Sequence, residues 1–183
     1  MATPARARRT SDTRSRIQAV ALELFTSAGL ERTSLQQIAD RLGLTKPALY
    51  YHFASRDELV LSLLQPFVDD IQEFLGAQQS GPRGGDRTAF LESYVDLLLR
   101  HRDVSRLIVQ EPAALDSVGV GTIVEWRYRL IALLVGADAD PADQIRATVA
   151  VGGLADCTVM FPDTPPAELR RAAVAAAAGA LGE

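Results

Sequence analysis

The sequence lacks several features that define common classes of protein. Its 183 residues include one cysteine, Cys157, so the chain cannot close an intramolecular disulfide. Its apolar runs are interrupted well before the roughly 20 residues that a membrane span needs. The basic start of the chain, with Arg6, Arg8 and Arg9, is not followed by the apolar region of a secretory signal. We therefore expect a cytoplasmic protein in a reducing compartment.

Signatures of catalysis and of metal binding are also missing from the sequence. His101 and Cys157 are candidates for chemistry, but neither stands in a Ser-His-Asp set, a metal-ligand spacing or a Gly-rich phosphate loop. Lone residues of these types on helices usually have structural or surface roles. We expect neither a metal nor a cofactor, and an enzyme is the least supported class of function.

Positive charge is unevenly distributed, and Lys46 is the single lysine. The formal net charge of −4 argues weakly against nucleic acid as a partner. Residues 1–60, however, hold nine Arg or Lys against six Asp or Glu, whereas the rest holds ten against seventeen. The pattern suggests that any nucleic-acid contact is made by the basic N-terminal part. Chance arginine usage is the alternative interpretation.

Helical periodicity is present almost throughout the chain. Apolar residues recur on one stripe from Arg14 to Ala28, and Gly29 is placed to end that helix. Ser34 and Gln37 have the spacing of a capping box at the start of a second helix.

Gly43 is placed to end the second helix, and Thr45 to cap a third. Proline is tolerated two residues after that cap, because the first turn of a helix has no intrahelical donors to lose. The two short helices and their tight turn predict a helix-turn-helix.

The predicted third helix has two different faces. Leu49 and Phe53 point to one side, which suits a core. The other face combines aromatic rings with polar tips, a cation and a flat proline, and it suits a DNA major groove better than a core. It is formed by Pro47, Ala48 and Tyr51, flanked by Lys46, Tyr50 and His52.

Four runs together carry a resemblance to a known family. They are Ser34–Ala39 (SLQQIA), Leu42–Thr45 (LGLT), Ala48–Phe53 (ALYYHF) and Ser55–Leu59 (SRDEL). With these runs, residues 12 to 62 resemble the DNA-binding domain of the TetR family of bacterial transcriptional regulators. The resemblance implies an all-helical homodimer that a small molecule in the C-terminal domain releases from DNA.

The resemblance also implies roles for individual residues. Positions that meet base edges in the family correspond to Lys46, Pro47, Ala48 and Tyr51, and in some members to Gln36. Positions that contact phosphates correspond to Ser34, Thr45, Tyr50, His52 and Arg56. Family members often carry Gly or Ser where Pro47 stands, and Pro47 lacks the amide for a backbone contact. They often carry Lys where Arg56 stands, which keeps the charge.

Simpler interpretations of the same residues remain open. His52 packs at the edge of the head in one of them, Tyr50 covers the core in another, and Ala48 serves as spacing. The three N-terminal arginines form either a solvated tail or an arm in the minor groove.

The remaining sequence predicts further helices. Ser55 to Glu58 has the pattern of a full capping box at the start of a long helix, in which Pro66 should produce a kink. Gly76 to Gly85 predicts a flexible loop. Asp140 and Thr164 each precede a proline and are candidate N-caps of the last two helices.

Small residues on the last two helices favour close helix packing. The resemblance to the TetR family implies a four-helix dimer interface made from this pair on two subunits, which fits a helix-turn-helix that reads two half-sites. An ordinary buried helix and simple alanine-rich composition are the alternatives. The candidate interface residues are Gly152, Gly153, Ala172 and Ala176.

A ligand pocket is expected among the middle helices, and most of its candidates taken singly also suit a core. They are Phe67, Ile71, Phe74, Tyr94, Leu98, His101, Trp126 and Ile131.

Together these patterns and the resemblance to the TetR family predict an all-α fold with three parts. Residues 1–11 form a flexible basic arm, residues 12–58 a three-helix DNA-binding head, and residues 59–183 a helical ligand-binding and dimerisation domain. The predicted function is a repressor that leaves double-stranded operator DNA on binding a largely hydrophobic inducer. A helical protein that answers to a protein partner is the second hypothesis, and an all-helical enzyme is the third.

Overall fold

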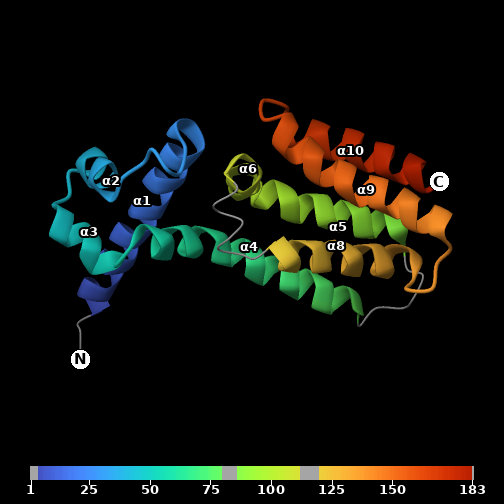
Figure 1. The fold of residues 1–183 in the computed structure, drawn as a ribbon, viewed down its shortest axis with the longest axis horizontal. Helices are drawn as coiled ribbons and strands as arrows, with labels where there is room; N and C mark the ends of the chain where they lie inside the picture. Colours follow the sequence, from blue (N-terminus) through green and yellow to red (C-terminus); the bar gives the residue numbers. More distant parts are fainter. Residues whose placement is uncertain (1–3, 80–85, 112–119, 183) are drawn as a thin grey trace. The chain divides into compact units, whose positions relative to one another are not determined.

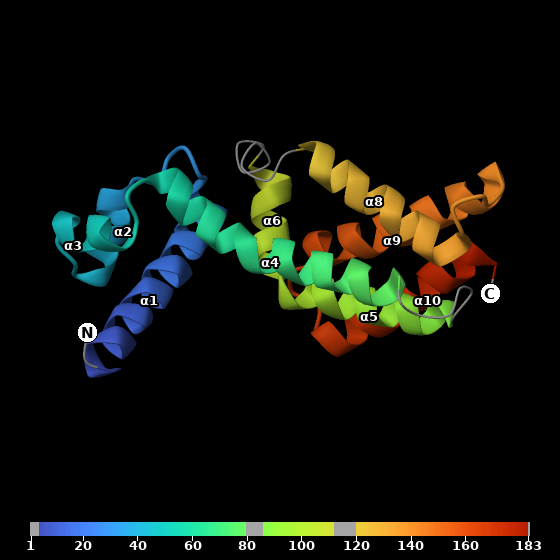
Figure 2. The same cartoon turned by 90° about the horizontal axis from the view of Figure 1, so that it is seen from below.

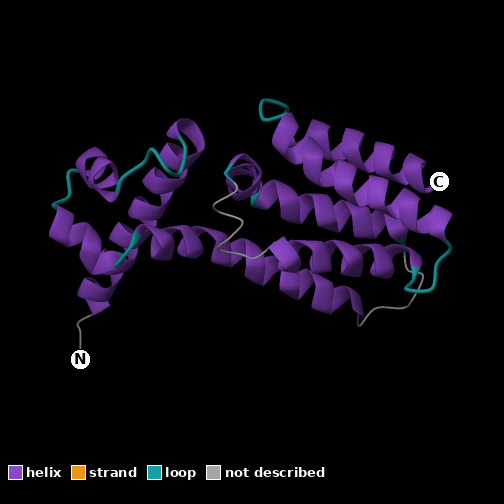
Figure 3. Cartoon of the chain, viewed as in Figure 1, coloured by secondary structure: helices purple, strands orange, loops and turns teal. Residues whose placement is uncertain are grey.

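The computed structural model of the chain describes residues 4–79, 86–111 and 120–182. Over these ranges every regular element is an α-helix, and Figure 3 shows helices joined by loops. The all-α fold class predicted from the sequence is therefore confirmed. Within the same ranges, none of the helices is both long and apolar enough to cross a membrane.

The first three helices pack around a small apolar core. They are α1 (Pro4–Ala28), α2 (Leu35–Leu42) and α3 (Lys46–His52), as Figure 1 and Figure 2 show. Burying a large apolar side chain stabilises a fold by about 1.5–3 kcal/mol. This core therefore holds α2 and α3, which are too short to be stable alone. Its largest members are the fully buried side chains of Ile17, Phe25, Ile38, Leu49 and Phe53.

Capping sets the ends of α2 and α3 as the sequence predicted. Ser34 Oγ accepts a hydrogen bond from the Gln37 N–H at 3.2 Å, and Gln37 Oε1 accepts from the Ser34 N–H at 2.7 Å. Gly43 ends α2 with a φ of 65°, which glycine adopts without steric cost. Thr45 Oγ1 accepts from the Ala48 N–H at 3.3 Å. The segment is therefore a helix-turn-helix.

The start of α1 corrects one expectation. Residues 1–11 were expected to form a flexible arm, but α1 begins at Pro4, so the described part of this segment is helical. Proline suits the first helical turn, and the alanines and arginines that follow are strong helix formers. Apolar periodicity placed the start at Arg14 because the preceding segment has no apolar stripe to bury.

Helix α4 (Arg56–Gln79) continues past Pro66. Proline has no N–H, so it cannot donate to the carbonyl of Ser62 four residues earlier. Gln18 of α1 supplies a donor instead, because its Nε2 lies 3.2 Å from the Ser62 carbonyl oxygen and 3.0 Å from Ser62 Oγ. This segment of α4 is thereby fastened to α1, and the kink at Pro66 stays a prediction.

Both ends of α4 differ in part from the sequence-based expectation. Ser55 Oγ accepts from the Glu58 N–H at 3.0 Å, as a capping box requires. The Glu58 carboxylate, however, accepts from the Ala54 N–H at 2.7 Å and not from the Ser55 N–H, so the prediction of a full capping box is wrong. Both Ser55 and Ala54 precede the helix, where amides have no intrahelical acceptor. The loop expected from Gly76 is also wrong over its first four residues, which are helical up to Gln79. A helical glycine costs only about 1 kcal/mol, and the remainder of that loop lies outside the described residues.

The C-terminal helices pack mainly against one another. Helices α9 and α10 run side by side in Figure 1 and Figure 2, α5 contacts both, and α8 contacts α9. The bounds are α5 (Arg87–Arg100), α6 (Arg102–Gln110), α8 (Val120–Val135), α9 (Pro141–Met160) and α10 (Pro166–Leu181).

The described chain divides into two compact units within helices rather than within a loop. One unit extends to Pro66 and includes α6 from Arg106, and the other begins at Phe67. The first turns of α4 group with the head, and they carry the buried side chains of Leu59, Val60 and Leu64. The functional division expected after residue 58 stays a prediction.

Proline sets the start of the last two helices in different ways. Asp140 caps α9 as predicted, with its side chain accepting from the Asp143 N–H at 2.9 Å. Thr164 is not a cap, because α10 begins at Pro166 and its N-cap position is Pro165, with φ −53° and ψ 134°. A residue before proline is pushed into extended geometry. The tandem prolines therefore move the helix start one residue further along the chain.

Candidate functional site

The outward face of α3 has the exposure that its sequence predicted. Leu49 and Phe53 are fully buried, whereas the side chain of Tyr51 is 73% exposed and that of Tyr50 is 44% exposed. Pro47 is exposed and Ala48 is half-buried. Both tyrosines therefore reach the surface, and the face offers polar tips and ring edges to a partner.

Ring contacts give the two tyrosines distinct neighbours. The ammonium of Lys46 lies 5.8 Å from the centre of the Tyr50 ring, at the outer limit of a cation–π contact. The rings of Tyr51 and His52 meet edge to face with centres 5.3 Å apart, and His52 is half-buried. His52 thus packs against Tyr51, an exposed residue of the face.

The hydroxyls of Ser34 and Thr45, both predicted to contact phosphates, differ in whether their proton is already used in a hydrogen bond. Ser34 Oγ lies 3.0 Å from Gln37 Oε1 and donates its proton there. A phosphate oxygen accepts hydrogen bonds only, so Ser34 has to release this bond before it can contact DNA. Thr45 Oγ1 accepts from the Ala48 N–H and keeps its proton for an outside acceptor. Of the two residues, Thr45 can therefore donate a hydrogen bond to a phosphate without first breaking a bond within the protein.

Gln36 and Asp40 form a pair on the exposed side of α2. Gln36 Nε2 donates to Asp40 Oδ1 at 2.7 Å, one helical turn away. The bond uses one of the two amide hydrogens and leaves the other hydrogen and the carbonyl oxygen free. A glutamine needs those two groups for a bidentate contact with adenine, so Gln36 remains competent for that contact.

Arg56 has a partner within the head. Its guanidinium donates to the carbonyl oxygen of Leu30 at 3.3 Å, which links the start of α4 to the segment after α1. A guanidinium has five N–H donors, so this bond leaves others for a phosphate. The phosphate role of Arg56 stays a prediction.

Arg14 is a residue that the sequence did not single out. Its guanidinium carbon lies 4.1 Å from the centre of the Phe53 ring, and its NH1 donates to the carbonyl oxygen of His52 at 2.7 Å. Arg14 thus connects α1 to the last turn of α3. The two contacts join residues 38 or more positions apart, so local patterns do not reveal them. The side chains of Arg6, Arg8 and Arg9 lie outside what the structure describes.

Two groups of predicted pocket residues come together in the C-terminal unit. In the first, the Phe67 ring lies 5.5 Å from the His101 ring and 6.1 Å from the Trp126 ring, between centres. His101 Nε2 lies 2.8 Å from Asp70 Oδ2, which also accepts from Arg100 at 2.8 Å. The hydrogen bond from His101, and then that from Arg100, lowers the pKa of the Asp70 carboxyl.

The second group surrounds Phe74. Its ring centre lies 5.3 Å from that of Phe90 and 6.0 Å from that of Tyr94. Burial raises the pKa of Tyr94 to about 12, because the ionised phenol would be poorly solvated there. The sequence-based pocket prediction did not include Phe90, although Phe90 lies one turn before the predicted Tyr94 on α5. The other predicted pocket residues are buried, namely Ile71, Leu98 and Ile131.

The predicted interface residues lie on the outer side of α9 and α10. Gly153, Ala172 and Ala176 are exposed, and Gly152 is partly exposed. Two large apolar side chains stand one turn apart on α9, with Ile145 64% and Val149 60% exposed. They are an apolar face that nothing in the described protomer covers.

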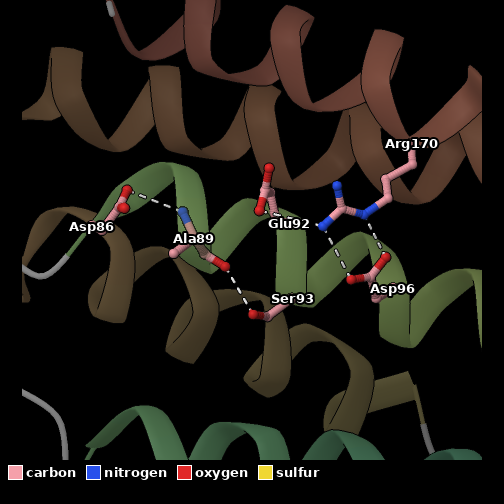
Figure 4. Close-up of polar contacts among 6 residues, drawn as sticks. All are labelled: Asp86, Ala89, Glu92, Ser93, Asp96 and Arg170. Atoms are coloured by element: carbon pink, nitrogen blue, oxygen red, sulfur yellow. Dashed lines mark hydrogen bonds and ion pairs between the residues drawn. The ribbon is translucent and has the colours of Figure 1, made fainter. Parts of the chain in front are cut away.

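An ion-pair cluster fixes α10 against α5 (Figure 4). Arg170 Nε lies 2.7 Å from Asp96 Oδ1, and Arg170 NH2 lies 3.3 Å from Glu92 Oε2. Asp86 caps the start of α5 by accepting from the Ala89 N–H at 3.1 Å. The cluster holds the inner side of α10 and leaves its small residues facing outward.

Comparison with known proteins matches the head to one family. The model of the bacterial regulatory proteins, tetR family, matches residues 17–63. The HTH-type transcriptional activator FasR of Mycolicibacterium smegmatis is 33% identical over 118 residues, which cover 60% of this chain and 53% of that protein. The repressor KstR2 of Rhodococcus jostii is 33% identical over 99 residues, which cover 54% of this chain and 48% of that protein. The chain thus matches about half the length of these relatives.

Solved structures extend the likeness in fold over most of the chain. The ketosteroid transcriptional regulator KstR2 of Mycobacterium tuberculosis superposes with a TM-score of 0.69 at 19% identity, covering 93% of both chains. A transcriptional regulator from Aquifex aeolicus VF5 gives a TM-score of 0.68 at 21% identity, covering 90% of this chain and 96% of that one. The C-terminal helices therefore share their arrangement with solved regulators.

Proposed function

The chain belongs to the TetR family of bacterial regulatory proteins, and we propose on this premise that it is a cytoplasmic, ligand-responsive transcriptional regulator. It binds double-stranded operator DNA as a homodimer and leaves it when a small, largely hydrophobic molecule binds. The observation that supports this best is the exposed face of α3, in which Tyr51 is 73% exposed while Leu49 behind it is fully buried. A helix that presents such a face within a helix-turn-helix suits the major groove.

The base-reading part of the proposal assigns a role to each group on this face. The Tyr51 hydroxyl donates to or accepts from base edges, and the Lys46 ammonium donates to guanine acceptors or a nearby phosphate. Pro47 and Ala48 supply apolar contact for thymine methyl groups. Gln36 adds a bidentate contact from α2.

The phosphate-binding part involves the edges of the same surface. Thr45, Tyr50 and His52 offer hydrogen bonds to phosphates. Ser34 contributes once its bond to Gln37 is released, and Arg56 contributes through the N–H donors that its bond to Leu30 leaves free. These contacts position α3 without reading sequence.

The dimer part of the proposal rests on the exposed apolar side of α9 and α10. Small residues such as Gly153 and Ala176 allow two helix pairs to approach closely, while Ile145 and Val149 supply apolar area. A two-fold dimer places two copies of α3 on half-sites about 34–36 Å apart, or a multiple of one DNA turn.

The ligand part concerns the aromatic side chains around Phe67 and Phe74. An inducer shifts the equilibrium only if it binds the released state more tightly than the DNA-bound state. Helix α4 begins in the head and carries both phenylalanines, so contacts with them reach the head through one continuous element. Tyr94, His101 and Trp126 orient a mostly apolar molecule.

The experiment for DNA binding is selection of bound fragments from genomic DNA with the purified full-length protein, followed by sequencing. A palindromic sequence should be enriched, and a Tyr51→Ala variant should lose the enrichment. Tyr128→Ala is the matched control, because Tyr128 is 70% exposed but lies on α8. Equal, unenriched recovery of all fragments by the wild type would contradict the proposal.

The direction of regulation and the inducer need two further measurements. Transcription in vitro from a promoter next to the selected site should fall when the protein is added, and a rise would make it an activator. Once a screen of apolar compounds finds an inducer, Phe67→Ala and Trp126→Ala should weaken its effect on operator affinity. Tyr128→Ala should not, and an equal response in all three variants would refute the pocket assignment.

A further inference from the structure

Arg14 contacts the end of α3 in two ways, although it belongs to α1. Its NH1 donates to the carbonyl oxygen of His52 at 2.7 Å, and its guanidinium carbon lies 4.1 Å above the Phe53 ring. Phe53 is fully buried, so the ring that supports the guanidinium is itself fixed by the core. Arg14 therefore has a defined place rather than a freely moving one.

The position of these contacts matters because α3 is only seven residues long. The last carbonyls of a helix lack intrahelical donors and carry partial negative charge. Phe53 is extended after the helix, with φ −142° and ψ 114°, so no further turn supplies a donor to His52. The Arg14 guanidinium supplies both a donor and a positive charge at this end.

The contact leads through His52 to Tyr51, which is 73% exposed on the outward face of α3. Arg14 holds the backbone of His52, and the His52 ring meets the Tyr51 ring edge to face at 5.3 Å. We propose that Arg14 is a positioning residue for DNA recognition, which fixes the last turn of α3 so that Tyr51 meets the base edges. This inference rests on the function proposed above.

A phosphate contact is the competing role for an arginine near DNA, and the two roles predict different results. A phosphate contact contributes equally to every DNA sequence, and its loss lowers the log–log salt slope by about 0.9. A positioning residue contributes to the specific operator, and its loss leaves the slope of the specific complex unchanged. Arg14 and Tyr51 should then depend on each other, because Arg14 acts through the orientation of Tyr51.

The test measures operator and non-specific DNA affinity of the full-length protein over a range of salt concentrations. Arg14→Ala should weaken operator binding about tenfold or more while leaving non-specific binding and the salt slope at wild-type values. Arg14→Lys keeps the charge but not the planar stack or the fork of donors, so it should behave like Arg14→Ala. Arg16→Ala is the matched control, since Arg16 is an exposed arginine on the same helix.

A double-mutant cycle separates positioning from a general loss of stability. In a Tyr51→Ala background, Arg14→Ala should cost less than about threefold in operator affinity. Circular dichroism shows whether each variant is folded at the assay temperature, and Arg14→Lys carries the test if Arg14→Ala is not.

Three results would overturn the inference while leaving the proposed function intact. They are wild-type affinity in Arg14→Ala, full rescue by Arg14→Lys, and additive effects of Arg14→Ala and Tyr51→Ala together with a lower salt slope. If the wild type itself binds no operator, the proposed function fails and the inference fails with it.

Discussion

Replacement of Tyr51 by alanine separates DNA recognition from the stability of the head. The side chain is 73% exposed, so its truncation removes little buried surface. Loss of the edge contact with the His52 ring costs about 1 kcal/mol. The higher helix propensity of alanine offsets roughly 0.5 kcal/mol of that cost. We therefore expect the free energy of unfolding to change by less than about 1 kcal/mol.

The loss in operator affinity should be larger. A lost base contact costs about 1–3 kcal/mol, which corresponds to roughly 5- to 150-fold in the dissociation constant. A homodimer carries Tyr51 in both half-sites, so the loss per dimer is about 2–6 kcal/mol if the half-sites are independent.

The assay is fluorescence anisotropy with a labelled operator duplex, accompanied by circular dichroism and denaturant unfolding. Tyr51→Phe removes the hydroxyl alone and divides the loss between hydrogen bonding and ring contact. Tyr128→Ala removes an equally exposed tyrosine from α8 and should keep wild-type affinity. Unchanged operator affinity in Tyr51→Ala, with an intact helical spectrum, would show that α3 is not the recognition helix.

Three further predictions address charge, assembly and burial. Arg56→Ala should lower the log–log salt slope by about 0.9, and an unchanged slope and affinity would leave Arg56 with its bond to Leu30 only. Gly153→Leu should break the dimer yet keep the protomer folded, since an added Cβ meets no described heavy atom within 4 Å apart from its chain neighbours and the adjacent backbone of its own helix. Light scattering that still shows a dimer at low micromolar protein would move the interface elsewhere. Tyr94 favours the folded state fully below about pH 10. That contribution is lost as the pH rises toward its folded pKa of about 12. The ultraviolet titration difference between wild type and Tyr94→Phe should therefore have its midpoint near 12, and a midpoint near 10 would refute the burial.

Local chemistry made most helix ends predictable from the sequence. The bonds between Ser34 and Gln37, and the left-handed Gly43, involve residues within a few positions of each other, and the structure contains them. Where local rules competed, prediction failed. The tandem prolines at 165 and 166 overruled Thr164 as a cap, because extended geometry before proline is a stronger constraint than a side-chain bond.

Contacts between distant segments were not predictable from one sequence. Nothing near Arg14 in the chain indicates Phe53, and nothing near His101 indicates Asp70, because each pair meets only after the helices pack. The exposure of the α3 face was predictable, since Leu49 and Phe53 fix which side faces the core. The DNA, ligand and dimer roles of individual residues stay predictions.

The bond between Gln18 and Ser62 has a consequence for how the molecule opens locally. The backbone hydrogen bonds of α4 lack the one that Pro66 would donate to the Ser62 carbonyl, and the side chain of Gln18 from α1 donates to that carbonyl oxygen instead. Cooperative opening should therefore divide α4, although it is continuous as a helix. The backbone amides of α4 before Pro66 should exchange hydrogen for deuterium at rates similar to those of α1. The amides after Phe67 should exchange at rates similar to those of the C-terminal helices. One helix would then report two opening free energies, with the step at the residue that has no amide to exchange.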